Sequence, residues 1–405
     1  MNRKILLLAI LLSIYFVLFA EKPYVLMVSF DGFRYDYTEK TDTPNFDYLR
    51  DNGTKAESMQ SVFPSKTFPN HYSLATGAYA GTHMLVSNSF YDPEFDEFYS
   101  IGDSTKVTDP KWYKSEPIWV TAERQDVRTA SYFWVGSEAP IKGILPSIVK
   151  EYDHGFSYEA RIDSVMTWLQ LPEEIRPHLV MLYFDQPDSD GHKFGPENPE
   201  LHKTIKYMDG ILGKILQGIQ ELPIADDLNL ILVSDHGMTS VGKGQTINIS
   251  EFLPDPKNVR KYFRGPVSLL HLIDKSPDKI AELDEILKSI PHMQAFKYNE
   301  IPERFHFQNR NSGDFVLVAD EGWIISNDGR AYNSAGTHGY DPILKNMHGI
   351  FYAMGPDIKS NYKISTFENI NVYPLICELL QIEPYKDAPD APEGKLEVLE
   401  EILMK

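Results

Sequence analysis

The sequence predicts an α/β fold, in which a mostly parallel sheet is covered by helices on both faces. First, apolar runs alternate with amphipathic stretches from about Lys22 to Gly237, as is typical of such a sheet. Second, Tyr24–Phe30, His178–Phe184 and Leu228–Val233 are apolar runs of the length of buried strands. Third, each run ends beside acidic or histidine residues, and open parallel sheets bind ligands at the carboxyl ends of their strands. At 405 residues, the chain can bury a sizeable core as one large domain or two.

The other elements of this first part follow from local sequence patterns. A helix is expected over Pro44–Asn52, with Thr43 as its N-cap. Val127–Trp134 is predicted to be a buried strand, and Ile162–Leu169 a helix that precedes the second apolar run. Leu201–Glu221 has the i, i+3, i+4 apolar spacing of a long amphipathic helix. Helices therefore connect successive strands, as a parallel sheet requires.

A second part of the sequence interrupts this alternation. Between Val241 and Arg330 the pattern loosens into short strands and one helix, Lys279–Ile290, which predicts a smaller inserted cap region. The chain then returns to the main fold with a strand over Gly349–Met354 and a helix over Ile370–Leu380. We expect one catalytic domain over residues 21–385, with the insertion at about 241–330 and a C-terminal tail over 386–405.

The N-terminal residues predict export. Basic residues in Met1–Lys4 precede the apolar run Ile5–Ala20. This run of roughly 16 residues is shorter than the ~20 that a spanning helix needs. A signal peptide over residues 1–20 is therefore favoured over an uncleaved anchor, and the mature protein is expected to be secreted or periplasmic, without a stable membrane span.

Charge and cysteine content exclude some classes of function. With 58 acidic and 39 basic residues, the net charge is −19, which disfavours long nucleic acid as the partner. A small phosphorylated ligand remains compatible, because bound zinc ions would reverse the local charge. Cys377 is the single cysteine, so no intrachain disulfide can form, and its place in an apolar helical pattern predicts that it is buried.

Aspartate and histidine residues recur just after the predicted strands. Each has a simpler interpretation by itself: a turn at Asp31, a surface loop at Asp235-His236, or a glycine-marked turn around His338. Asp188 and His192 are expected in a Pro- and Gly-rich loop rather than on a helix. Together these residues supply three carboxylates and three imidazoles, the oxygen and nitrogen ligands that suit Zn²⁺. Six ligands complete one tetrahedral site and half of another, so a second ion needs further ligands.

A hydroxyl group near the start of a helix could supply one of these ligands and act as the nucleophile. Thr67 lies just before the helical pattern Pro69–Thr76, which has a proline near its first turn. The positive end of a helix dipole and its free N–H groups also bind phosphate oxygens. The alternative is that Thr67 only caps the helix. Coordination to zinc would favour ionisation of the hydroxyl at neutral pH.

These residues match the motifs of a known family. The chain resembles the nucleotide pyrophosphatase/phosphodiesterase family of the alkaline phosphatase superfamily over about Lys22 to Glu383, nearly the whole mature chain. The motifs that carry the resemblance are Ser29–Arg34, Lys66–Tyr72, Asn88–Asp92, Pro187–His192, Ser234–Met238 and Gly336–Tyr340. The resemblance implies an alkaline phosphatase-like α/β fold.

The resemblance also implies a site with two Zn²⁺ and assigns residues to it. One ion would be bound by Asp188, His192 and His338. The other would be bound by Asp31, Thr67, Asp235 and His236, with Thr67 as the nucleophile. Asn88 matches the side chain that binds a non-bridging phosphate oxygen together with the Thr67 N–H. Phe68 and Tyr152 match aromatic side chains that stack on a nucleobase, and Glu138 lies in the segment that closes the nucleoside pocket.

The implied function is an exported two-zinc nucleotide pyrophosphatase/phosphodiesterase. It would hydrolyse phosphodiester or pyrophosphate bonds of small nucleotides and release nucleoside 5′-monophosphates through a phosphothreonine intermediate. The alternative is a phospholipid or choline-ester phosphodiesterase that uses the same metals. The chain departs from the family pattern at three positions near the predicted substrate pocket, where Met84, Ser87 and Val135 replace a common Gly, Asp and Pro.

Overall fold

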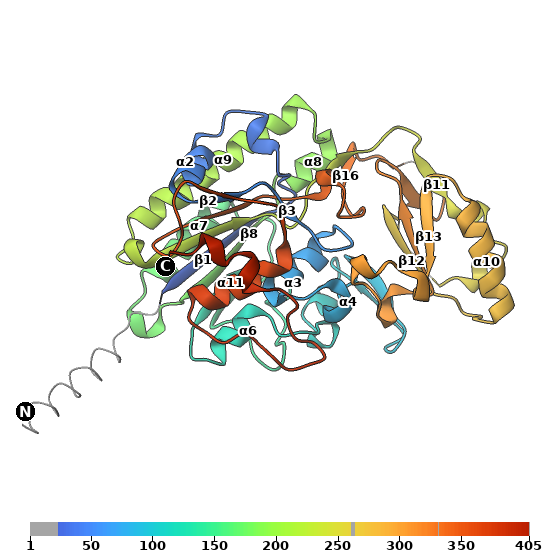
Figure 1. Cartoon of the computed structure of the whole chain (residues 1–405), viewed down its shortest axis with the longest axis horizontal. Helices are drawn as coiled ribbons and strands as arrows, with labels where there is room; N and C mark the ends of the chain where they lie inside the picture. Colours follow the sequence, from blue (N-terminus) through green and yellow to red (C-terminus); the bar gives the residue numbers. More distant parts are fainter. Residues whose placement is uncertain (1–22, 261–263, 331, 405) are drawn as a thin grey trace, which may run out of the picture.

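The main sheet of the protein is mostly parallel, as predicted. The computed structural model describes residues 23–260, 264–330 and 332–404, so the predicted signal peptide lies outside the described residues. Within them, the sheet has eight strands in the order β18-β2-β17-β9-β1-β8-β6-β7, and β17 alone runs antiparallel to its neighbours (Figure 1). The strands are β1 (Tyr24–Phe30), β2 (Thr54–Ala56), β6 (Thr129–Tyr132), β7 (Ile148–Lys150), β8 (Leu179–Phe184), β9 (Leu228–Val233), β17 (Phe351–Met354) and β18 (Tyr362–Ile364).

Helices cover both faces of this sheet because the strands are apolar on both sides. In β1, Leu26, Val28 and Phe30 pack into one apolar core, whereas Val25 and Met27 pack into the other. The first core is completed by α2 (Pro44–Asn52), α7 (Tyr158–Leu169) and α9 (Pro199–Gln220). The second is completed by α3 (Thr67–Thr76), α6 (Ile118–Glu123) and α11 (Val372–Leu379), on the opposite side of the sheet in Figure 1.

Several predictions about single elements can be compared with these bounds. The strand predicted over Val127–Trp134 is shorter, because β6 covers only Thr129–Tyr132. Thr43 is the N-cap residue of α2, but its side chain makes no capping hydrogen bond. Cys377 is buried in α11, as predicted. Among the described residues, no helix combines the length and the hydropathy needed to cross a membrane.

The strand register brings the ends of three central strands to one level. Phe30 of β1 pairs with Phe184 of β8, and Ser29 pairs with Val233 of β9. The chain segments that follow β1, β8 and β9 therefore emerge side by side at the carboxyl edge of the sheet. This is where the sequence predicts a ligand site.

The region predicted as an insertion forms its own small lobe, to the right in Figure 1. Its antiparallel strands are β12 (Val267–Leu270), β14 (Phe315–Ala319) and β13 (Met293–Lys297), in this spatial order, with α10 (Pro277–Ser289) packed against them. A short parallel pair, β11 (Thr246–Asn248) and β15 (Ile324–Ser326), adds to this lobe. The Arg310 guanidinium joins the lobe to the main body through two hydrogen bonds of 2.9 and 3.0 Å to the buried Asp92 carboxylate.

Two smaller features frame the site. The hairpin of β4 (Ser89–Asp92) and β5 (Glu97–Ser100) follows Asn88, and β10 (Thr239–Ser240) pairs with β16 (Gly336–Thr337) across the base of the lobe. The C-terminal tail is not detached: Leu399 and Ile402 are buried in the same core as α3 and α11.

Candidate active site

Residues that follow β1 and β9 form a buried cluster at the carboxyl edge of the sheet. The His236 Nε2 atom lies 3.0 Å from Asp235 Oδ2 and 3.4 Å from Asp31 Oδ1. The backbone N–H of Gly32 donates to Asp235 Oδ1 over 3.1 Å, which ties the ends of the two strands together. All three side chains are essentially without solvent exposure.

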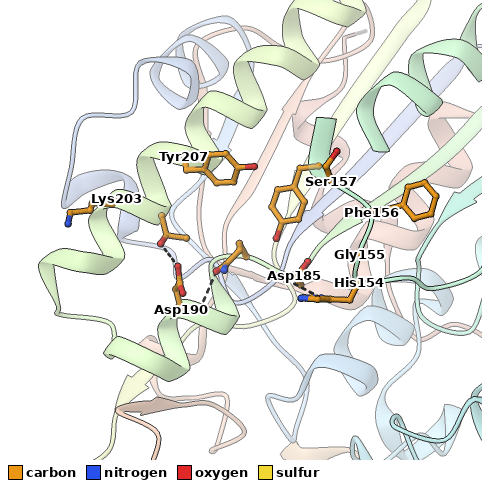
Figure 2. A pocket seen from close by; sticks show the side chains of 11 residues that line it. His154, Gly155, Phe156, Ser157, Asp185, Asp190, Lys203 and Tyr207 are labelled. Atoms are coloured by element: carbon orange, nitrogen blue, oxygen red, sulfur yellow. Dashed lines mark hydrogen bonds and ion pairs between the residues drawn. The ribbon is translucent and has the colours of Figure 1, made fainter. Parts of the chain in front are cut away.

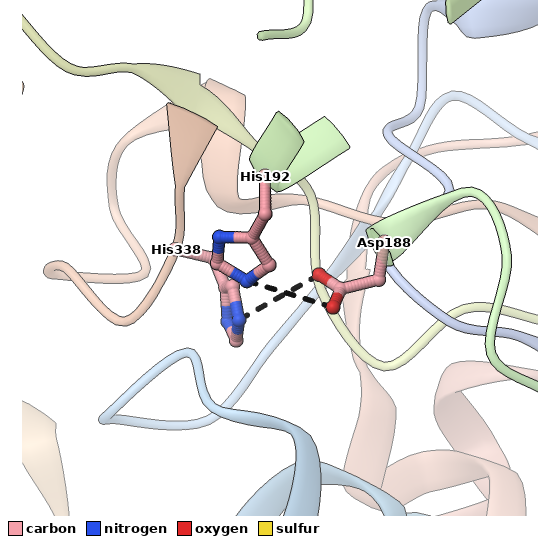
Figure 3. Close-up of side chains that lie close together, drawn as sticks. All are labelled: Asp188, His192 and His338. Carbon is pink, nitrogen blue, oxygen red and sulfur yellow. Dashed lines mark ion pairs between the residues drawn. The ribbon is translucent and has the colours of Figure 1, made fainter. Parts of the chain in front are cut away.

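The second group of predicted ligands adjoins this cluster, but its local structure differs from the prediction. Asp188 and His192 lie on a short helix, α8 (Asp188–Phe194), and not in a loop. Helical i, i+4 spacing places both on one face, with His192 Nε2 3.5 Å from Asp188 Oδ2. His338, which follows β16, has its Nε2 3.6 Å from Asp188 Oδ1, so both rings face one carboxylate (Figure 3). The residues expected to form one site are therefore brought together.

Backbone carbonyl groups fix the protonation of these imidazoles. The Nδ1 atoms of His192, His236 and His338 lie 2.8 to 2.9 Å from carbonyl oxygens, which can only accept a hydrogen bond. Each Nδ1 therefore carries a proton, and in the neutral form of each ring the lone pair is on Nε2, which faces the cluster. Burial, and then the neighbouring His236, hold the pKa of His338 well below its usual range. This tautomer, with its backbone partner, is the one that metal-ligating histidines adopt.

The carboxylates of the cluster show why a cation fits here. Asp31 Oδ1, Asp188 Oδ1 and Asp235 Oδ2 are buried atoms without a hydrogen-bond partner among the described residues. Burial raises the pKa of Asp31 well above its usual range, and the nearby carboxylates of Asp235 and Asp188 raise it further. Unpaired buried carboxylate oxygens that converge with imidazole lone pairs would be costly without positive charge between them. The donor set therefore fits divalent metal ions bound by oxygen and nitrogen.

The ligand atoms fall into overlapping groups within 4.8 Å. One group is Asp188, His192 and His338, as the sequence predicts for one ion. A second contains Asp31 and His236 together with Asp188, so Asp188 lies between the two halves of the site. This close approach depends on Gly32, whose φ of +66° favours glycine and where a Cβ atom would meet Asp188 at 2.8 Å.

The predicted nucleophile is directed at this cluster. Thr67 is the first residue of α3, and Lys66 occupies the N-cap position, so the alternative that Thr67 only caps the helix is wrong. Its Oγ1 lies 3.2 Å from His236 Nε2. The Phe68 N–H donates to Asn88 Oδ1 over 3.0 Å, and Pro69 has no N–H. The Thr67 N–H is thus the free donor at this helix end, beside the side-chain NH₂ of Asn88.

The cluster opens into a cavity of about 680 Å³, whose walls include Phe68, Glu138 and Tyr152. This size suits a small ligand, since such pockets measure roughly 300–1,000 Å³. Tyr152 is half-exposed and its ring lies 5.1 Å from that of Phe133, between centroids. Glu138 Oε1 accepts the Tyr152 N–H over 3.0 Å. One carboxylate oxygen of Glu138 is therefore committed to holding Tyr152 in place.

Two residues that support the cluster were not predicted. The Nδ1 atom of His71 lies 3.0 Å from the Thr67 carbonyl oxygen and 3.3 Å from Asp235 Oδ2, and its Nε2 lies 2.8 Å from Ser29 Oγ. Because the carbonyl only accepts, His71 Nδ1 carries a proton that it donates to the Thr67 carbonyl oxygen, so this nitrogen has no lone pair for a metal ion. Tyr183 donates its hydroxyl proton to Asp31 Oδ2 over 2.6 Å. The available signal for His71 was its i+4 spacing from Thr67 on a helix.

The departures from the family pattern also have structural positions. Met84 adopts a left-handed conformation with φ of +66° at the end of α4 (Ala80–His83), where glycine carries no strain. Its carbonyl accepts a hydrogen bond of 3.1 Å from Asn311 of the inserted lobe. Val135 lines the cavity, whereas Ser87 lies outside it.

The fold and the site together define a class: an α/β protein with a carboxylate and imidazole centre at the carboxyl edge of its sheet, facing a hydroxyl at a helix N-terminus. The chain belongs to the type I phosphodiesterase/nucleotide pyrophosphatase family, whose model matches residues 25–341. The resemblance found in the sequence motifs is thereby confirmed at the level of the family.

Relatives of known name agree with this assignment. The chain is 37% identical over 377 residues to human ectonucleotide pyrophosphatase/phosphodiesterase family member 1, which covers 90% of this chain and 40% of the relative. It is 37% identical over 379 residues to the venom phosphodiesterase of Naja atra, covering 90% of this chain and 45% of the relative. The chain thus spans less than half the length of these curated relatives.

Solved structures match the fold over nearly the whole chain. Murine ectonucleotide pyrophosphatase/phosphodiesterase 5, as an inactive variant in complex with AMP, superposes with a TM-score of 0.88 at 32% identity. The match covers 94% of this chain and 100% of the murine chain. The human protein of the same name gives a TM-score of 0.87 at 32% identity.

Proposed function

We propose that the protein is an exported hydrolase that cleaves phosphodiester or pyrophosphate bonds of small nucleotides and releases nucleoside 5′-monophosphates. The observation that carries the proposal is the position of Thr67. Thr67 is the first residue of α3, and its hydroxyl contacts His236 of the buried cluster. The same residue lines the cavity, whose walls also carry aromatic side chains. Membership of the family supports the same reaction.

Residues of this chain provide the parts of the reaction. Thr67 Oγ1 loses its proton to solvent and attacks phosphorus, and its bond to phosphorus forms as the bond to the leaving oxygen breaks, which takes up a proton from solvent as its pKa requires. Water then cleaves the phosphothreonine, which restores the Thr67 hydroxyl and releases the nucleoside 5′-monophosphate. The Thr67 N–H and the side-chain NH₂ of Asn88 donate to a non-bridging oxygen, where negative charge develops. The Tyr183 hydroxyl keeps the Asp31 carboxylate oriented, and the Gly32 N–H does the same for Asp235.

Two Zn²⁺ are the cofactors that we propose. Asp188, His192 and His338 would hold one ion, and Asp31, Thr67, Asp235 and His236 the other. When bound, the ions would lower the pKa of the nucleophile and stabilise the attacking and leaving oxygens. Three carboxylates offset most of the charge of two such ions, which leaves room for the single negative charge of a phosphodiester.

The cavity supports a nucleotide as substrate. Phe68 and Tyr152 line it together and can stack on a nucleobase, and Glu138 fixes Tyr152. Base stacking of this kind is tolerant of base identity. AMP is bound in the murine relative, which has the same fold at 32% identity. Long nucleic acid is a poor partner for a chain with a net charge of −19.

Export rests on the sequence of residues 1–20 and on the names of the relatives, which include a venom enzyme and ectoenzymes. Processing can be tested by expressing the whole chain in a secreting host and sequencing the N-terminus of the product. An exported protein that begins near Glu21 supports cleavage, and retention of residues 1–20 in a membrane fraction contradicts it.

The function itself is tested by product analysis. The purified protein is assayed with NAD, a dinucleoside polyphosphate, ATP and lysophosphatidylcholine, and products are identified by chromatography. Release of AMP from the nucleotides, abolished in Thr67→Ala, supports the proposal. Release of phosphocholine without AMP would replace it with the lipid phosphodiesterase alternative.

A further inference from the structure

A second cavity adjoins the first on the side of α8. It has a volume of about 530 Å³ and lies between the segment His154–Tyr158, the start of α8 and the N-terminal part of α9 (Figure 2). His154 and Asp185 line both cavities, so the two are neighbours that share a wall. The proposed function uses only the first cavity.

The position of the second cavity relates it to the leaving group. Gln186 and Asp190, which flank Asp188 in the sequence, line it, whereas Thr67 and Phe68 line only the first cavity. Thr67 contacts the half of the cluster formed by His236, away from α8. In an in-line displacement, the leaving group departs opposite the nucleophile. A large leaving group would therefore extend toward α8 and the second cavity.

An aromatic wall suits a base in this place. Tyr207, on α9, is half-exposed at the cavity and its ring centroid lies 5.9 Å from that of Tyr158, with an interplanar angle of 28°. Tyr158 also contacts the Phe184 ring, 4.9 Å away between centroids, and the Arg161 guanidinium, 4.8 Å from its ring centroid, so its ring is held in place. Tyr207 thus provides a supported ring with free area, the kind of surface on which heterocycles stack.

The polar groups of the shared wall favour a sugar over a phosphate. Asp185 lines both cavities, with its buried Oδ1 facing the Arg161 guanidinium at 3.5 Å and its Oδ2 lying 3.9 Å from Nδ1 of the exposed His154. The Oδ2 atom at this wall can accept a hydrogen bond from a hydroxyl donor such as that of ribose. Lys203 is turned to Glu200, with both contacts at 2.8 Å, and Asp190 adds a further carboxylate. A free pyrophosphate group would meet like charge here.

We propose that the second cavity binds the nucleoside of the leaving group. The ribose hydroxyls bond to Asp185, and the base stacks on Tyr207. Preferred substrates are then dinucleotides joined by a short diphosphate bridge, such as NAD, over nucleoside triphosphates, whose leaving group is pyrophosphate. The inference rests on the proposed nucleotide hydrolysis and names its substrate class.

The test compares three substrates in four proteins. NAD carries a second nucleoside, whereas ATP and a nitrophenyl ester of a nucleoside 5′-monophosphate do not. In Tyr207→Ala, kcat/KM for NAD should fall about 5- to 10-fold, the lower part of the range for one lost stacking face, with the other two substrates unchanged. Tyr207→Phe keeps the ring and should restore the parent value. Tyr48→Ala, on α2, removes an equally exposed tyrosine and is the matched control.

A second variant, Asp185→Asn, is expected to change kcat/KM for ATP and for NAD in opposite directions. It removes the negative charge at the shared wall, so kcat/KM should rise severalfold for ATP while it falls for NAD. The inference is wrong if the ratio of NAD to ATP stays at its parent value in Tyr207→Ala, or if all three substrates lose activity equally. Failure of the parent protein to release a nucleoside monophosphate from any substrate would instead contradict the proposed function.

Discussion

The two halves of the aspartate and histidine cluster differ in their access to solvent. In the half next to Thr67, the side chains of Asp235 and His236 are fully buried, whereas those of Asp188 and His192 are 17% and 29% exposed. The buried half sits on the ends of two central strands and is braced by His71 and Tyr183. The other half combines Asp188 and His192 of the short helix α8 with the buried His338, which follows β16. The difference indicates that the nucleophile is held rigidly, while the opposite side is open to arriving and departing groups.

The largest expected effect comes from removing the nucleophile in the buried half. Thr67→Ala should lower kcat by on the order of 10³-fold or more, because the attacking oxygen is lost. The fold should persist, since the N-cap residue of α3 is Lys66 and the Thr67 hydroxyl contacts His236 rather than the helix end. Thr67→Ser keeps a hydroxyl and should retain part of the activity. Rates with a nitrophenyl phosphodiester, together with thermal unfolding, measure both. Near-normal turnover in Thr67→Ala would show that another group attacks phosphorus.

Removing metal ions tests whether the two halves of the cluster bind separate ions. A chelator should abolish activity and lower Tm, because ions that bind only the folded state stabilise it. His192→Ala should leave about one bound zinc per chain, in the buried half, and reduce kcat/KM by on the order of 10²-fold. His202→Ala, on α9 away from the cluster, is the control. Elemental analysis that finds two zinc ions in His192→Ala would refute the division into two sites.

The next largest effect is expected when an aromatic ring that stacks on the base is removed from the first cavity. Phe68→Ala or Tyr152→Ala should reduce kcat/KM for nucleotides about 5- to 150-fold, since stacking is worth roughly 1–3 kcal/mol per base. A simple aryl phosphodiester, bound at the cluster and Asn88, should lose much less. The ratio of the two substrates cancels general damage to the site. Equal losses on both would mean that these rings only pack the protein.

The smallest effect concerns a histidine outside the cluster. His83 Nδ1 accepts the Leu85 N–H over 3.2 Å, so the ring is neutral, and burial lowers its pKa to about 3. This folded-state pKa lies below the unfolded value near 6.5. The resulting stability is present above pH 6.5 and is lost as the pH falls toward 3. In His83→Gln, the decrease of Tm between pH 7 and 4 should be shallower; an unchanged slope would rule this contribution out.

The sequence predicted the positions that depend on strand ends better than those that depend on packing. Asp31 and Asp235 follow apolar runs that were predicted as buried strands of one mostly parallel sheet, and the structure brings them together. Around Asp188, proline and glycine residues argued for a loop, yet the segment forms a helix whose first turn contains Asp188 and Asp190. Acidic residues there suit the positive end of the helix dipole.

Other features had no local signal in the sequence. His71 is a buried residue of α3 with neighbours from distant segments, so its pattern is that of an ordinary core position. The second cavity arises where α8, α9 and the start of α7 meet, and no single segment encodes it. The half-exposed Tyr207 has the periodicity of any outward-facing helical residue. Long-range packing gives such residues their role.

The pairing of β10 with β16 has a consequence for how the protein could change. Thr239 pairs with Thr337 and Ser240 with Gly336, so the chain leaves the main body soon after His236 and returns just before His338. The stacked rings of these histidines, 3.5 Å apart between centroids, depend on this closure. The lobe between them can be lengthened, trimmed or grafted from a relative only if its two stems stay paired and its contacts with the main body, such as Arg310 with Asp92 and Phe305 with Phe63, are kept. Sequence changes can then accumulate in the lobe while the arrangement of His236 and His338 at the edge of the sheet stays the same.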